Sequence, residues 1–270
     1  MIVILKSFFD GANQADSTQY DVISLASVSG TSEYWRPFER DWKATLKRHH
    51  APWLHTTDAV SLKRQPFTKE NGWDEAKRDV FISDCVTVIE KHLLHPKSKR
   101  EPRGRPGLLA HVVTIVLSDF IRARTANPEV PRDVTVLCAT QAVDRAIARG
   151  KVIGVHHYYL TFDQNEPFMG HILDRQHNRK ARKHLAPVIE RISHIGESDM
   201  REVPALQMAD LFAWCYSHKK RTPRFDWQNR LLSHRKWIDD WYTYDKLIRI
   251  IPGVADLVQS WGLPPRKPTR

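Results

Sequence analysis

The chain has 270 residues, with 42 Lys and Arg against 31 Asp and Glu, so its formal net charge is +11. This length predicts one or two domains, and ten Phe, nine Trp and seven Tyr exclude low-complexity disorder. The apolar stretches are all shorter than the roughly 20 residues that a bilayer requires, so we expect no membrane span. The basic excess favours a polyanionic partner, whose binding would gain affinity from counterion release.

The cysteines and the N-terminal sequence indicate a cytoplasmic protein. Cys85, Cys138 and Cys215 are far apart, lie in apolar contexts and form no C-x-x-C motif. They therefore predict neither a disulfide framework nor a zinc knuckle. The first ten residues lack the basic region and the cleavage site of a secretion signal.

The first half of the chain predicts strands and helices. Residues 2–9 and 20–29 are apolar runs joined by a turn-rich stretch, which is typical of a β-hairpin. Residues 34–49 and 74–94 carry apolar side chains at helical spacing. Residues 108–117 are apolar without a clear period, and they fit either a strand or a buried turn of helix.

The second half predicts further helices around one strand. Residues 133–149 have a helical apolar face, and residues 156–162 are rich in the β-branched and aromatic residues of strands. Residues 166–184 read as a basic helix. Residues 204–218 are apolar nearly all round, which is typical of a helix buried in the core.

We predict an α/β main domain over residues 1–220, with a Trp-rich helical extension over residues 221–270 packed on it. The extension carries four Trp among charged residues. Its last residues, 264–270, contain three Pro and are expected to be disordered.

Three acids stand where a carboxylate is costly. Asp10 and Asp163 each end an apolar strand, and Asp210 lies inside the apolar helix. An ionised carboxylate in such a place needs a charged partner or a metal ion, and oxygen ligands suit Mg²⁺ or Mn²⁺. Two such cations about 4 Å apart clamp the attacking and leaving oxygens of a phosphodiester. The cluster and the basic surface together predict metal-dependent phosphodiester hydrolysis.

Each acid also has a purely structural interpretation. Asp10 precedes a glycine and Asp163 precedes Gln164 and Asn165, so either carboxylate could begin a turn. Asp210 could form a buried ion pair with an arginine.

Four motifs carry a family resemblance. They are F-F-D-G at residues 8–11, L-H-T-T-D at 54–58, F-D-Q-N-E at 162–166 and L-Q-M-A-D-L at 206–211. Over residues 1–220 the chain resembles a bacterial and phage family of uncharacterised proteins with a ribonuclease H-like fold. The closing motif is the most specific. The opening one lacks the acid that usually follows the first Asp.

The resemblance implies a ribonuclease H-like mixed sheet flanked by helices. In such proteins the acid of the first strand sits at the centre of the sheet, and the last acid comes from a C-terminal helix. Asp10 and Asp210 would then be metal ligands, and Asp163 matches the acid at the end of the later strand. Glu166 is a further candidate ligand or an acid at a helix N-terminus.

Residues beside the acids have candidate supporting roles. The family often has a His and an acid at the positions of His55 and Asp58, where a His could shuttle protons near neutral pH. Both could equally be structural, with Asp58 capping a turn. Gln207 lies one helical turn before Asp210, so it would either orient that carboxylate or satisfy a backbone group.

Basic stretches predict the path of nucleic acid. The bases that follow the acidic motifs are the strongest candidates for phosphate contacts. They are Arg175, Arg179, Lys180, Arg182, Lys183, Lys219 and Lys220. Trp227, Trp237 and Trp241 would either stack on unpaired bases or fix the extension to the domain.

The sequence thus leaves two main hypotheses. The first is a nuclease that depends on Mg²⁺ or Mn²⁺ and acts on DNA or RNA. The second, favoured by the altered opening motif, is a non-catalytic nucleic-acid-binding subunit of a defence or mobile-element system. A protein partner or a homo-oligomer is a further possibility, with the Trp-rich extension as interface.

Overall fold

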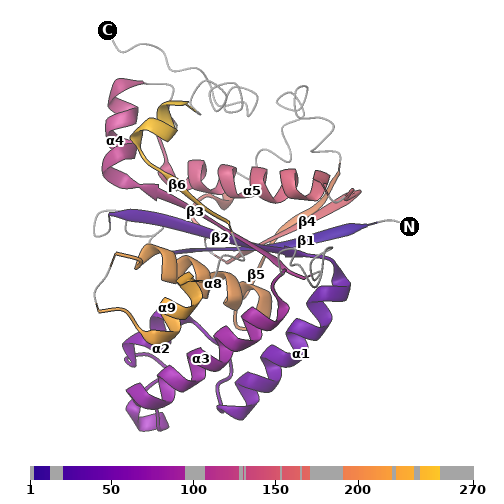
Figure 1. Ribbon diagram of the computed structural model, residues 1–270, viewed down its shortest axis with the longest axis vertical. Coiled ribbons are helices and arrows are strands. Elements are labelled where there is room, and N and C mark those ends of the chain that lie inside the picture. The colour runs from indigo at the N-terminus through magenta and orange to yellow at the C-terminus, as the bar shows by residue number, and fades with distance from the viewer. Residues whose placement is uncertain are drawn as a thin grey trace, which may run out of the picture.

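The computed structural model is a six-stranded mixed β-sheet between two layers of helices (Figure 1). It describes residues 3–12, 21–94, 107–127, 130, 132–152, 154–164, 166–170, 191–220, 223–233 and 238–249. The strand order is β5-β4-β1-β2-β3-β6. The strands are β1 (Ile4–Ala12), β2 (Val22–Gly30), β3 (Leu109–Val116), β4 (His157–Asp163), β5 (Ile192–Ser198) and β6 (Ile238–Tyr242).

Strand β1 lies inside the sheet and organises it. It pairs antiparallel with β2 as a hairpin, and it pairs parallel with β4 on its other side. Its side chains alternate between the faces, as a strand requires. Phe8 contacts Trp35 on one face, whereas Phe9 stacks on Phe162 on the other with ring centroids 4.5 Å apart. Asp10 therefore shares the face of Phe8.

The face of Phe8 is covered by α8 (Pro204–Ser217), the helix that packs directly on β1 and β2. Four further helices surround it in the same layer (Figure 1). They are α1 (Ser32–Arg48), α2 (Thr56–Ser61), α3 (Glu75–His92) and α9 (Asp226–Ser233). The opposite face is covered by α5 (Val134–Val152), with α4 (Leu117–Ala126) beyond it. A short 3-10 helix, η1 (Lys69–Asn71), precedes α3.

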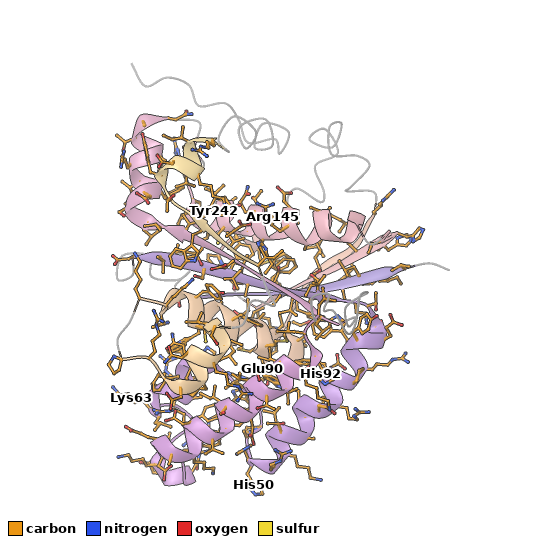
Figure 2. The ribbon with its side chains drawn as sticks, in the orientation of Figure 1. His50, Lys63, Glu90, His92, Arg145 and Tyr242 are labelled. Carbon is orange, nitrogen blue, oxygen red and sulfur yellow. The ribbon has the colours of Figure 1, made fainter. Side chains whose placement is uncertain are left out.

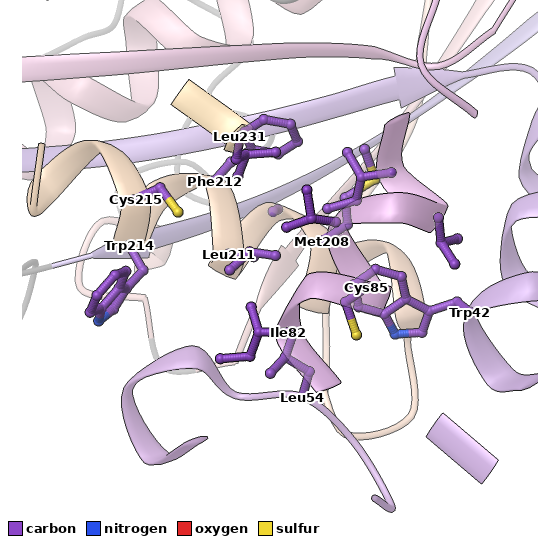
Figure 3. Packing of buried hydrophobic residues seen from close by; sticks show 14 of the residues in the cluster. Trp42, Leu54, Ile82, Cys85, Met208, Leu211, Phe212, Trp214, Cys215 and Leu231 are labelled. Carbon is purple, nitrogen blue, oxygen red and sulfur yellow. The ribbon is translucent and has the colours of Figure 1, made fainter. Parts of the chain in front are cut away.

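Helix α8 forms the centre of the larger hydrophobic core. Thirteen of its residues, from Pro204 to Tyr216, are buried. Met208, Leu211 and Phe212 pack among Trp42, Ile82 and their neighbours (Figure 3). A helix surrounded in this way needs apolar residues on every side, which explains why its sequence shows little amphipathic pattern.

Most of the predicted elements are confirmed. The structure contains the β1–β2 hairpin, α1, α3, α5, β4 and the buried α8, and residues 109–116 are a strand. It also contains α4 and β5, which the sequence patterns did not predict. The predicted basic helix beyond residue 170 and the predicted disorder of residues 264–270 lie outside the described residues.

The prediction of a wholly helical extension is wrong over residues 238–242. These residues form β6, which pairs parallel with β3 and so extends the main sheet. Asp240 on β6 accepts a hydrogen bond from the buried His111 and lies 2.9 Å from Arg145 of α5. These contacts hold the pKa of Asp240 well below its usual range, the bond from His111 having the largest effect.

Side-chain contacts on both faces fix the extension to the domain. Tyr242 donates to Gln141 of α5, and Figure 2 shows Tyr242 close to Arg145 on that side of the sheet. On the other side, Arg230 of α9 forms an ion pair with Glu90 of α3.

No helix among the described residues is long and apolar enough to cross a bilayer.

Candidate carboxylate site

Two of the predicted acids meet at the ends of neighbouring strands. Phe9 of β1 is paired with Phe162 of β4, so the next residues along these parallel strands are Asp10 and Asp163. Parallel strands bring their carboxyl ends to the same edge of a sheet. Phe9 and Phe162 belong to the core on the α5 side of the sheet. Because side chains alternate along a strand, the side chains of Asp10 and Asp163 lie on the opposite face, which α8 covers.

Asp210 approaches the strand ends from α8. It is 5% exposed, and its Oδ2 accepts a hydrogen bond of 2.6 Å from the backbone amide of Thr56. Thr56 begins α2, and the first amides of a helix have no partner within the helix. The carboxylate therefore joins α8 to the start of α2.

The acids perturb one another electrostatically. Burial, followed by the charges of Asp210, Glu166 and Asp163, raises the pKa of Asp10 well above its usual range. Burial likewise raises the pKa of Asp210 and of Asp163. Asp10 Oδ2 is buried and has no hydrogen-bond partner among the described residues. Buried carboxylates that repel one another favour either shared protons or a bound cation.

Glu166 completes the group of acids from the loop after β4. Its Oε1 accepts a hydrogen bond of 2.8 Å from the backbone amide of Gly11. This contact brings a carboxyl group next to Asp10, where the opening motif itself lacks a second acid. Burial is the main cause that raises the pKa of Glu166 to about 8.

His55 and Asp58 form a hydrogen-bonded pair beside Asp210. His55 Nδ1 lies 2.6 Å from Asp58 Oδ2. Burial alone would lower the pKa of His55, but the hydrogen bond to Asp58 and the charges of Asp210, Asp58 and Asp163 raise it to about 9. At neutral pH the protonated imidazole therefore places a positive charge among the clustered acids.

Gln207 connects the loops that carry this site. Its Oε1 accepts hydrogen bonds from Trp42 Nε1 and the Leu54 amide, at 2.8 and 3.0 Å. Its Nε2 donates to the carbonyls of Met200 and Arg201, at 2.8 and 3.4 Å. None of these four hydrogen bonds goes to Asp210, so Gln207 satisfies backbone groups, which was the second role predicted for it.

The acids fit the divalent metal that the resemblance implies only in part. The unpartnered Asp10 Oδ2 and the mutual repulsion of the acids fit a cation. Among the described residues, however, no three His, Cys, Asp or Glu side chains form a group that could hold a metal ion. Asp10, Asp163 and Asp210 have the oxygen chemistry that Mg²⁺ or Mn²⁺ needs, without a complete set of ligands in position.

The predicted basic surface is described only in part. The residues from Arg175 to Lys183 lie outside the described residues. Lys219 follows α8, forms an ion pair with Asp239 at 3.1 Å and lies over the ring of Trp241. Lys220 is exposed.

The Trp residues can be assigned in part. Trp227 is 2% exposed and donates to Asp79, so it packs α9 against α3 and cannot stack on a base. Trp241 is partly buried against the larger core. Trp237 lies outside the described residues.

Three contacts that hold the acids come from backbone amides and could not be predicted from the sequence; one is the Gly11 amide that donates to Glu166. The Met200 amide donates to Asp163 Oδ1 at 3.1 Å, and the Thr56 amide holds Asp210. Any residue except proline supplies such a donor, so side-chain identity carries no signal for them.

No protein-family model matches the chain, and neither the curated proteins nor the solved structures that were compared with it give a significant match.

Proposed function

We propose that the protein is a divalent-metal-dependent nuclease with a ribonuclease H-like fold, which hydrolyses phosphodiester bonds of DNA or RNA. The observation that carries this proposal is the convergence of Asp10, Asp163 and Asp210, which come from three separate elements. Besides burial, the charges of Asp210 and Asp163 raise the pKa of Asp10, and the charge of Asp210 also raises the pKa of Asp163. Acids gathered at such a cost to stability are typical of functional sites.

The positions of the acids support the ribonuclease H-like assignment. Asp10 lies on a strand with neighbours on both sides, and Asp210 lies on a late helix packed against that strand. The resemblance implies this arrangement of first and last acids. The formal charge of +11 gives the protein a general attraction for nucleic acid.

Under this proposal Asp10, Asp163 and Asp210 would be the residues that hold Mg²⁺ or Mn²⁺. The bound metal would activate a water molecule and stabilise the charge that develops on the phosphate. Glu166 would release its proton when the cation binds, since a nearby positive charge favours the carboxylate. His55, protonated and oriented by Asp58, is suited to donate a proton to a leaving oxygen.

The test is hydrolysis of labelled single-stranded DNA, duplex DNA, RNA and RNA–DNA hybrid with Mg²⁺, Mn²⁺ or EDTA. The Asp210→Asn protein is the matched variant, because its side-chain oxygen can still accept the hydrogen bond from Thr56. We expect cleavage that needs both the metal and Asp210. Cleavage that survives in the folded Asp210→Asn protein would contradict the assignment.

A non-catalytic nucleic-acid-binding subunit is the second candidate. It is favoured by the lack of a three-ligand group among the described residues and by the raised pKa of Glu166, which leaves a proton in the site at neutral pH. This candidate predicts salt-dependent binding without turnover, and the Asp210→Asn change would leave that binding intact. The catalytic activity would then come from a protein partner or from a complex with a second copy of the chain.

A further inference from the structure

Trp53 and Arg201 form an exposed pair beside the candidate site. The guanidinium of Arg201 lies over the indole ring of Trp53, 5.3 Å from its centroid. Arg201 is exposed and Trp53 is partly exposed. Among the described residues no carboxylate forms an ion pair with Arg201, although its backbone amide is bound by Asp199. The pair is therefore a positive charge held on an aromatic surface and available to a ligand.

Both members of the pair belong to segments that also hold the carboxylates. Trp53 precedes Leu54, and burial alternates along this segment, with Leu54 and Thr56 at 0% exposure between the partly exposed Trp53 and His55. Alternation of this kind places Trp53 and His55 on the same side of an extended segment. Trp53 thus lies on the side of the segment where the His55 imidazole meets Asp58.

Arg201 belongs to the second segment, which precedes α8. It follows Met200, whose amide holds Asp163. Gln207 accepts from the Leu54 amide and donates to the carbonyls of Met200 and Arg201. One buried side chain therefore fixes the backbone on both sides of the pair. Groups held by such contacts lose little freedom when a ligand binds.

We propose that Trp53 and Arg201 form a docking point for unpaired nucleic acid, in which a base stacks on the indole and an adjoining phosphate pairs with the guanidinium. Stacking on aromatic rings and pairing with arginine are the two contacts by which proteins hold single strands. A duplex offers its phosphates but keeps its bases stacked internally, so it uses only the second contact. This inference deepens the proposed function, on whose nucleic-acid substrate it rests.

Binding of labelled oligonucleotides in EDTA tests the inference without any hydrolysis, and the titrations are repeated with Ca²⁺ to allow for repulsion by the carboxylates. We expect the wild type to prefer a single strand over a duplex of the same length. Trp53→Ala should weaken single-strand binding roughly tenfold, Trp53→Phe should recover most of it, and duplex binding should not change.

Arg201→Gln should remove one phosphate contact. The slope of log binding constant against log salt concentration for the single strand should then become less steep by about 0.7. Lys77→Gln is the matched control, because Lys77 lies over the ring of Trp73 in a similar pair at the start of α3. It should leave both the affinity and the single-strand preference unchanged. Thermal unfolding of each variant confirms that it is folded.

The inference is overturned if the wild type shows no single-strand preference in either buffer, or if both Trp53→Ala and Arg201→Gln bind as the wild type does. These outcomes are separable from failure of the proposed function. Binding that depends on Trp53 in a protein without metal-dependent hydrolysis would leave the docking point standing and remove the nuclease. Metal-dependent hydrolysis that is unaffected by Trp53→Ala and by Arg201→Gln would support the nuclease and remove the docking point.

Discussion

Gln207 donates a hydrogen bond of 2.8 Å to the carbonyl of Met200, whose own amide donates to Asp163. Oε1 of Gln207 accepts a hydrogen bond from the backbone amide of Leu54. Leu54 lies two residues before Thr56, whose backbone amide donates to Asp210. One buried glutamine on α8 therefore sets the backbone of both segments that orient the acids. This arrangement makes Gln207 a positioning residue for Asp163 and Asp210.

Replacing Gln207 with leucine tests this role. The change leaves Trp42 Nε1, the Leu54 amide and the Met200 carbonyl without their partner, and each buried unsatisfied group costs about 1–3 kcal/mol. We expect the free energy of unfolding in urea to fall by about 3 kcal/mol or more. The rate of any hydrolysis should fall as well, since the two segments whose amides hold Asp163 and Asp210 lose their support.

Gln228→Leu is the control for that variant. Gln228 is also buried, at 2% exposure, and donates to the carbonyls of Cys215 and His218 at the end of α8. It should lose stability without losing the activity of the folded protein. The positioning role is wrong if both variants lose activity equally, or if Gln207→Leu is as stable as the wild type.

The shifted pKa of Glu166 predicts how stability depends on pH in EDTA. The folded protein holds a proton on Glu166 up to about pH 8, whereas an unfolded chain releases it near the ordinary value of 4.5. Between these values the folded state binds more protons, so this group lowers the free energy of unfolding as pH rises. Thermal unfolding should show that Glu166→Gln gains stability relative to the wild type from about pH 4.5 to about pH 8. A stability difference that stays constant across this range would disprove the shift.

His55 should titrate far above an ordinary histidine. Its contact with Asp58 and the neighbouring acids raise its pKa to about 9. The stability that this contributes is complete below pH 6.5 and is lost as pH rises through about 9. In an NMR titration, Asp58→Asn should move the midpoint of His55 downward, because the main partner of the imidazolium is gone. Midpoints near 6.5 in both proteins would show that the pair does not form.

Divalent cations should stabilise the folded protein through the acids. We expect Mg²⁺ or Mn²⁺ to raise the melting temperature, and more so at pH 8 than at pH 5, because protons compete with the metal for the carboxylates. Asp10→Asn should abolish the increase, since Asp10 carries the unpartnered buried oxygen. Equal increases in both proteins would mean that the cation binds elsewhere.

The sequence predicted the interior of the fold better than its edges. Strands β1, β2 and β4 and helix α8 are apolar runs whose burial follows from composition alone. By contrast, β6 has the sequence Ile-Asp-Asp-Trp-Tyr and becomes a strand through its pairing with β3 and the contacts of Asp240. Strand β5 is half-exposed at the other edge and shows no clear alternation. Whether such an edge segment becomes a strand depends on its tertiary contacts and not on its local sequence pattern.

The candidate site shows a similar division. Asp10, Asp163 and Asp210 could be found because an acid in an apolar setting is conspicuous. Besides burial, the charges of Asp210 and Asp163 raise the pKa of Asp10, which agrees with the convergence of the three acids. The docking pair of Trp53 and Arg201 could not be found, since neither residue belongs to a motif. Only the fold brings together residues that are 148 positions apart in the sequence.

The most direct test of the carboxylate site is the hydrolysis assay with Mg²⁺, Mn²⁺ or EDTA on the wild type and the Asp10→Asn protein. We expect the wild type to cleave at least one nucleic acid when the metal is present. Asp10→Asn should lower the cleavage rate more than about 100-fold, since mutating even a residue that only supports a metal ligand typically lowers affinity or activity 10- to 100-fold. Equal cleavage by the two folded proteins, or cleavage that continues in EDTA, would contradict the carboxylate site.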